Sequence, residues 1–100
     1  GVEVFGAYAF DRSDETVKIN GAPVVLTAKE FELARVFFTN PHRPLSRAYL
    51  METVWKSTAE LSTRTLDMHV SRIRSKLQLS AENGYRLQTI FGFGYRLEVF

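Results

Sequence analysis

Hydrophobic residues alternate with polar or small residues near both ends of the chain, whereas in the middle they recur at intervals of three or four. Alternation is typical of strands with one buried face, and the longer interval is typical of amphipathic helices. In residues 1–26 the alternating residues are Tyr8, Phe10, Val17 and Ile19. A polar turn at 12–15 separates the two pairs, and Asn20-Gly21 favours a two-residue type I′ hairpin. A small antiparallel sheet is therefore predicted before any helix.

Two short helices are predicted next. Thr27 and Glu30 have the spacing of a capping box, so a helix begins at Thr27, and Asn40-Pro41 ends it. Its buried face contains Phe31, Ala34 and Phe38. Ser46 is the predicted N-cap of a second helix that runs to about Trp55. The inner side of that helix carries Leu50 and Val54. Residues 56–61 form a polar connection to the third helix.

The third predicted helix, residues 62–77 with Ser62 or Thr63 as its cap, separates apolar and polar residues most clearly. At about 100° per residue, one narrow stripe contains Leu66, Val70, Ile73 and Leu77. The opposite side carries Arg64, Met68, Ser71, Arg72 and Ser75. Arg74 lies on one flank beside Asp67, and His69 and Lys76 lie on the other. One side is predicted to be buried, and the other is either a solvated basic surface or a surface that contacts DNA.

The end of the chain predicts a β-hairpin, with alternating strands at 85–90 and 95–100 around a glycine-containing turn at 91–94. The whole order is sheet, three helices and hairpin. This order predicts a single α+β domain over residues 1–100: a winged helix-turn-helix with an N-terminal antiparallel sheet, three helices and a C-terminal hairpin as the wing. In such a domain the last helix enters the major groove of DNA.

The distribution of charge supports DNA as the partner more than the mild net charge of +2 does. Residues 1–40 contain four basic and six acidic side chains, whereas residues 41–77 contain seven basic and three acidic ones. Residues 78–100 contain two of each sign. Positive charge is thus concentrated around the third helix, as expected of an electrostatic footprint on one face.

Other functional classes fit the sequence poorly. There is no cysteine, and the two histidines, His42 and His69, lie in a proline-flanked turn and on the basic helix. Gly92-Phe93-Gly94 lacks the third glycine of a dinucleotide site. Three acidic residues at 11, 14 and 15 surround Arg12 without an EF-hand pattern, so they favour a solvated loop. We therefore expect no enzyme activity, no cofactor, no metal site and no membrane association, and a cytoplasmic protein.

Several blocks of this sequence, in order over nearly the whole chain, resemble the effector domain of OmpR/PhoB-type response regulators. These blocks are Leu26-Thr27-x-Lys29-Glu30-Phe31-x-Leu33, Asn40-Pro41, Leu45-Ser46-Arg47-x-x-Leu50, Val54-Trp55, Arg64 to Arg74 with Lys76-Leu77, and Thr89-Ile90-x-Gly92-x-Gly94-Tyr95-Arg96-Leu97. Each block alone is a weak signal. Their common order and spacing make the resemblance specific.

The resemblance implies roles for the third helix. Arg72 reaches base edges, Met68 contacts a thymine methyl group, and Arg64, His69 and Arg74 hold phosphates. Lys76 extends the basic border of the same face. Two structural alternatives stay open: Arg74 forms an ion pair with Asp67, or His69 is a partly covered surface histidine.

Two positions depart from the pattern of many relatives. Phe91 replaces an arginine that enters the minor groove, so we expect the ring to pack under the wing, with contact to sugars or to a protein as the alternatives. Ser71 replaces a second arginine, which predicts fewer charged contacts and a shallower salt dependence of DNA binding.

The resemblance also implies partners outside the helix. We expect a phosphate-accepting receiver domain upstream and a cognate sensor kinase acting on it. The chain also starts with Gly rather than Met, so we expect that a segment is missing upstream. Phosphorylation would dimerise the full protein on direct-repeat half-sites, while the isolated domain would be a monomer. Some relatives contact RNA polymerase through the segment that corresponds to loop 56–63, but here its sequence favours a plain connector.

A winged helix used for protein association is the main alternative function. Aromatic residues make up 13% of the chain, and the hairpin or the first sheet would be the contact surface. That interpretation leaves the alignment of Arg64, Arg72, Arg74 and Lys76 without a role.

Overall fold

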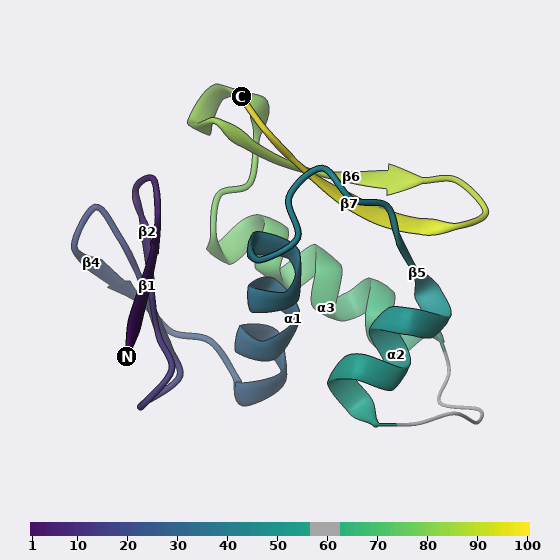
Figure 1. Cartoon of the computed structure of the whole chain (residues 1–100), viewed down its shortest axis with the longest axis horizontal. Helices are drawn as coiled ribbons and strands as arrows, with labels where there is room; N and C mark the ends of the chain where they lie inside the picture. Colours follow the sequence, from purple (N-terminus) through teal and green to yellow (C-terminus); the bar gives the residue numbers. More distant parts are fainter. Residues whose placement is uncertain (57–62) are drawn as a thin grey trace.

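The computed structural model describes residues 1–56 and 63–100. The chain opens with a four-stranded antiparallel sheet in the order β1-β2-β3-β4 (Figure 1). Its strands are β1 (Val2–Phe5), β2 (Tyr8–Asp11), β3 (Thr16–Ile19) and β4 (Ala22–Val24). Asn20 and Gly21 connect β3 to β4 with φ angles of 50° and 83°, the two left-handed conformations of a type I′ turn. The predicted sheet and turn are confirmed.

Three helices follow: α1 (Ala28–Phe38), α2 (Arg47–Trp55) and α3 (Thr63–Lys76). The capping box of α1 is present, because the Thr27 hydroxyl accepts from Glu30 N at 3.2 Å and Glu30 Oε1 accepts from Thr27 N at 2.9 Å. Ser46 Oγ accepts from Tyr49 N at 3.1 Å and caps α2. Thr63 is the first residue of α3 rather than its cap. The other predicted cap, Ser62, lies outside the described residues.

The second sheet contains the predicted hairpin and one strand that the sequence pattern did not predict. Strands β6 (Tyr85–Ile90) and β7 (Gly94–Val99) form the hairpin, and β5 (Leu45–Ser46) pairs with β7 in the order β5-β7-β6. A single turn of 3₁₀ helix (Ala81–Asn83) precedes β6. A two-residue strand has too few positions to display alternation, so tertiary pairing alone defines β5.

Gly94 lies where β5 meets β7, paired with Ser46. A Cβ atom built on Gly94 would overlap the Leu45 carbonyl oxygen. The close approach of these two backbones therefore requires glycine at this position.

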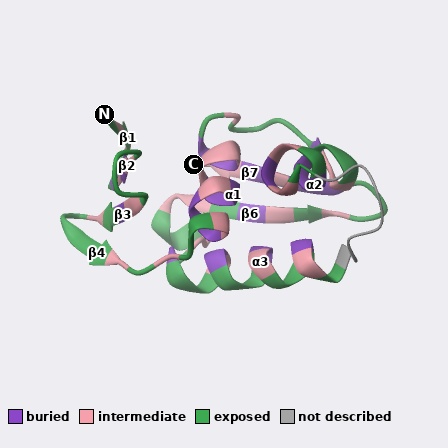
Figure 2. Cartoon of the chain, turned by 90° about the horizontal axis from the view of Figure 1, so that it is seen from below, coloured by how far each residue is buried: buried purple, intermediate pink, exposed green. Residues whose placement is uncertain are grey.

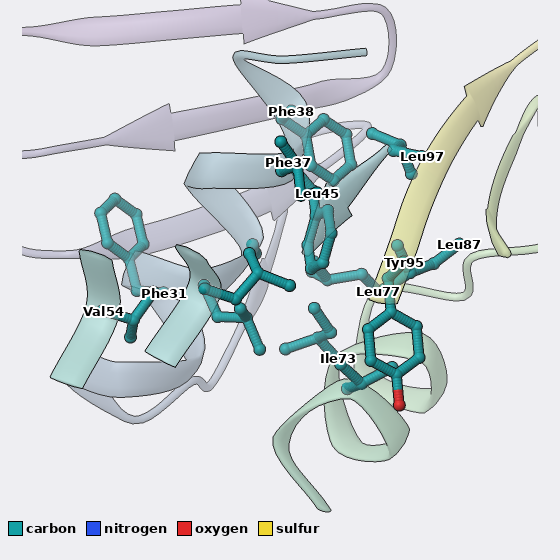
Figure 3. Close-up of a cluster of buried hydrophobic side chains, with 14 of the residues drawn as sticks. Phe31, Phe37, Phe38, Leu45, Val54, Ile73, Leu77, Leu87, Tyr95 and Leu97 are labelled. Atoms are coloured by element: carbon teal, nitrogen blue, oxygen red, sulfur yellow. The ribbon is translucent and has the colours of Figure 1, made fainter. Parts of the chain in front are cut away.

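The core lies where α1, α2 and α3 meet the two sheets (Figures 2 and 3). The buried faces predicted for the helices are confirmed; they contain Phe31, Ala34, Phe38, Leu50, Val54, Leu66, Val70, Ile73 and Leu77. Phe38 lies at the centre of the aromatic packing, with ring centroids 4.9 Å from Phe10, 5.0 Å from Tyr8 and 5.3 Å from Tyr85. These rings join the first sheet, α1 and β6. Much of the aromatic content thus stabilises the core, as expected of side chains that bury large apolar areas.

Candidate nucleic-acid interface

Helix α3 has a buried side and an exposed side, as predicted. Its apolar stripe, Leu66, Val70, Ile73 and Leu77, is 0% exposed. Arg64, Met68, Ser71, Arg72 and Ser75 are all exposed. In Figure 2, α3 lies along one edge of the molecule, with its exposed side turned away from α1 and α2. Burial of the stripe fixes the helix on the core and leaves a positively charged side facing outward.

Asp67 connects α3 to two other elements. Its two carboxylate oxygens accept from the Arg47 guanidinium at 2.8 and 3.0 Å, and Oδ1 also accepts from the Tyr95 hydroxyl. The Arg47 hydrogen bonds hold the pKa of Asp67 below its ordinary value, while burial raises the pKa of Tyr95 and the bond to Asp67 raises it further. This cluster of Arg47, Asp67 and Tyr95 joins the start of α2, the middle of α3 and the start of β7.

Arg74 fastens α3 to the hairpin. Nε and Nη2 donate to the Leu87 carbonyl at 3.0 and 2.7 Å, and Nη2 also donates to Thr89 Oγ1 at 2.9 Å. The guanidinium lies over the Tyr95 ring, 5.4 Å from its centroid. The alternative of a direct ion pair between Arg74 and Asp67 is wrong. Asp67 forms its ion pair with Arg47, and Arg74 donates to the β6 backbone instead.

Lys76 forms an ion pair at the other end of α3. Its Nζ lies 2.7 Å from Glu30 Oε1, and the Glu30 side chain is only 1% exposed. Burial raises the pKa of Glu30, but hydrogen bonds from Lys76 and Thr27 N outweigh it, so the net pKa is lowered. Lys76 therefore holds α3 to the start of α1 as well as adding charge to the border of the exposed side.

His69 is half-buried on the flank of α3. Its Nδ1 lies 2.8 Å from the Thr65 carbonyl oxygen, and its ring meets the Trp55 ring edge-on at 4.9 Å between centroids. A carbonyl oxygen only accepts, so Nδ1 carries the proton in this geometry. This placement agrees with the alternative that His69 is a partly covered surface histidine.

The turn of the hairpin places Phe91 in solvent. The ring is 100% exposed, so the expectation that it packs under the wing is wrong. The residues of the hairpin that face the core are Leu87, Tyr95 and Leu97, whereas Phe91 extends beyond the last paired residues, Ile90 and Gly94. The turn backbone is nevertheless held, because Phe93 N donates to Ile90 O at 2.9 Å and Arg47 N donates to Phe93 O at 3.0 Å.

Sequence reasoning named most of the exposed side of α3 but gave no role to Arg47 and Tyr95, which hold the hairpin beside it. Both residues fall within the blocks of the family resemblance, but on elements far apart in the sequence. Most of the loop with the expected polymerase contact, residues 57–62, lies outside the described residues. In the part of the chain that the structure describes, no helix is both long and apolar enough to cross a bilayer.

Comparison with known proteins agrees with this arrangement. Residues 21–97 match the family model described as transcriptional regulatory protein, C terminal. The chain belongs to this family. It is an OmpR/PhoB-type effector domain, and its solved neighbours are winged-helix domains.

Curated relatives of this effector domain are longer than the chain. It is 39% identical over 98 residues to the sensory transduction protein RegX3 of Mycolicibacterium smegmatis, covering 98% of the chain and 43% of that protein. It is 35% identical over 99 residues to the transcriptional regulatory protein ResD of Bacillus subtilis, covering 98% of the chain and 41% of ResD. The chain thus spans less than half the length of these relatives.

Solved structures give the same fold. The RstA DNA-binding domain of Klebsiella pneumoniae, in complex with the RstA box, matches with a TM-score of 0.82 at 26% identity, covering 97% of this chain and 96% of that one. The DNA-binding domain of the response regulator AdeR, in complex with an intercistronic region, matches with a TM-score of 0.78 at 28% identity, covering 97% and 98%.

Proposed function

We propose that this effector domain binds double-stranded DNA in a sequence-specific manner, as the output domain of a two-component transcription regulator. Helix α3 enters the major groove, and the β6–β7 hairpin lies beside it as the wing. The observation that carries this proposal is the exposed basic side of α3, opposite a fully buried apolar stripe. The similar domains of RstA and AdeR, solved with DNA, support it.

The exposed side chains of α3 take different roles in this proposal. Arg72 reads a guanine through two parallel hydrogen bonds, and Met68, half exposed, contacts a thymine methyl group. Arg64 neutralises a phosphate at the start of the helix. As an imidazolium, with Nδ1–H on the Thr65 carbonyl, His69 donates Nε2–H to a phosphate from the flank. Ser71 adds a hydroxyl contact between the two base-reading residues.

Arg74 and Lys76 contribute to DNA binding in a different way, because their cationic groups already form hydrogen bonds with β6 and α1. Arg74 keeps the wing at a fixed position relative to α3, and Lys76 keeps the end of α3 on α1. Both add positive charge near the DNA, which favours association with a polyanion even without a direct contact.

The wider setting follows from family membership. We infer an upstream receiver domain that accepts phosphate from a cognate sensor kinase, in the cytoplasm. The isolated domain is a monomer, and the full protein binds direct-repeat half-sites as a dimer about one helical turn apart. A contact of loop 56–63 with RNA polymerase is not part of this proposal, because the sequence of that loop favours a plain connector.

Selection of bound sequences from random duplexes tests the function. The wild-type chain and the variants Arg72→Ala and Arg12→Ala are compared at about 100 mM salt. Arg12 is an exposed arginine in the turn between β2 and β3, so its variant carries the same change of charge on a different part of the molecule. We expect one short enriched motif for wild type and Arg12→Ala, with one or two positions losing preference in Arg72→Ala.

Salt dependence separates DNA binding from the alternative of protein association. Each phosphate contact contributes about 0.9 to the slope of log K against log salt, so Arg64→Ala should flatten that slope by roughly this amount. Apolar association would instead survive added salt. Absence of any enriched motif at low and moderate salt would contradict the proposed function.

A further inference from the structure

The two methionines of the chain lie in opposite environments. Met68 is 50% exposed on the outward side of α3, whereas Met51, on the inner side of α2, is 7% exposed and belongs to the core. The chain contains no cysteine, so these two thioethers are its only sulfur groups. Because peroxides attack sulfur and need access to it, Met68 is the first group of this protein that such an oxidant modifies.

Met68 lies in the middle of the surface that the proposed function assigns to DNA. Arg64 and Arg72, both exposed, lie four residues before and after it, so the three side chains share one side of the helix. In its reduced form the Met68 side chain is apolar, as contact with a thymine methyl group requires. A chemical change at its sulfur therefore takes place where bases are read.

We propose that Met68 is a site of reversible oxidation by hydroperoxides, and that its sulfoxide switches off DNA binding by α3. This inference rests on the proposed function and adds a means of regulating the same site. The sulfur lone pair attacks a peroxide oxygen, an S–O bond forms as the O–O bond breaks, and the proton of the attacked oxygen passes to the leaving hydroxide, which departs as water. Sulfur loses two electrons and the peroxide gains them. Methionine sulfoxide reductase reverses the change, with a dithiol oxidised to a disulfide and the oxygen released as water.

The sulfoxide changes the exposed side of α3 in two ways. It replaces an apolar group by a polar S–O group, which loses hydration without gaining a hydrogen bond when it meets a thymine methyl group. Its oxygen is also an acceptor one helical turn from the Arg72 guanidinium, so it competes with guanine for the same N–H donors. Both changes weaken base reading, whereas the phosphate contact of Arg64 is kept.

Treatment of the chain with hydrogen peroxide tests the site. Peptide mass mapping measures oxygen addition at each methionine, and titration measures affinity for the duplex enriched by the untreated chain. We expect Met68 to be oxidised before Met51, affinity to fall about tenfold, and methionine sulfoxide reductase to restore it. The salt slope of the remaining binding should stay unchanged, since no phosphate contact is lost.

Two conservative variants assign the effect to one residue. Met68→Leu keeps an apolar side chain without sulfur, so its DNA binding should withstand peroxide. Met51→Leu is the matched control in the core, and it should lose binding after peroxide as wild type does. Thermal unfolding of wild type oxidised at Met68 should match that of the untreated chain, because this sulfoxide lies at the surface.

Three results would overturn the switch: unchanged affinity of the chain oxidised at Met68, loss of binding in peroxide-treated Met68→Leu, or equal oxidation rates of Met68 and Met51 in the folded protein. Failure of the untreated chain to enrich any duplex would instead overturn the proposed function, and the regulation that rests on it.

Discussion

Lys76 at the end of α3 donates to the buried carboxylate of Glu30 at the start of α1, with 2.7 Å between Nζ and Oε1. Glu30 serves two purposes, because the same oxygen accepts from Thr27 N and completes the capping box. A helix cap and an inter-helix ion pair therefore share one buried carboxylate. The position of α3 on the core therefore depends on Glu30, a residue of the capping box that begins α1.

Removal of Lys76 should destabilise the domain through this shared carboxylate. Lys76→Met would leave Glu30 buried with only its cap hydrogen bond, and we expect a loss of about 1–3 kcal/mol in the free energy of unfolding. Chemical denaturation of wild type and variant measures the difference. Lys18→Met, a change at an exposed lysine of β3, is the matched control and should cost far less. Equal stabilities of the two variants would contradict a structural role for Lys76.

Stability should fall in acid because of Glu30 and Asp67. Their pKa values are lowered in the folded protein from 4.5 and 3.8, so the unfolded chain binds more protons as the pH falls. The stabilisation is complete above those unfolded values and is lost as the pH drops through the folded ones. Asp67 is half exposed, so solvent screens its share of the loss.

Denaturation curves between about pH 7 and pH 3 check this dependence. Glu30→Gln, which keeps an oxygen acceptor for Thr27 N, should unfold with a weaker dependence on pH than wild type. A steeper dependence in Glu30→Gln would be evidence against the assigned sign of the pKa shift.

Arginine substitutions on α3 should separate binding from stability. Arg72→Ala removes an exposed side chain, so we expect unchanged unfolding but a loss of about 1–3 kcal/mol in discrimination at the base it reads. Arg74→Ala removes three hydrogen bonds to β6, so we expect a loss of about 1–2 kcal/mol in stability. Thermal unfolding and DNA titration of both variants, side by side, measure the contrast. Equal melting temperatures of Arg72→Ala and Arg74→Ala would show that Arg74 does not hold the hairpin on α3.

Substitution of Gly94 should displace β5 from the hairpin. Gly94→Ala would place a methyl group onto the Leu45 carbonyl, and since backbone must move to relieve the overlap, we expect destabilisation of about 3 kcal/mol or more. Gly21→Asn is the control, because Gly21 has open space around it and asparagine tolerates its positive φ. Amide exchange at Arg47, whose N–H bonds to Phe93 O, reports whether the turn has separated from α2. Exchange as slow as in wild type would contradict the predicted displacement.

The local sequence by itself determined the helices, the hairpins and the two sides of α3. Capping residues, the Asn20-Gly21 turn and the 3.6-residue spacing of Leu66, Val70 and Ile73 act over short distances along the chain, so they can be recognised without coordinates. The family blocks added the expected roles of Arg64, Met68 and Arg72, whose exposure agrees with them.

Only the tertiary structure decided how the cationic side chains are partnered and where the wing tip lies. Arg74 donates to the β6 backbone, whereas Asp67 forms its ion pair with Arg47. Lys76 forms an ion pair with Glu30, 46 positions away in the chain. Phe91 is exposed because the hairpin extends past the core at that turn. Such pairings depend on which elements meet in space. Arginine and lysine have long flexible side chains that can each reach several partners, so the sequence alone does not select the partner.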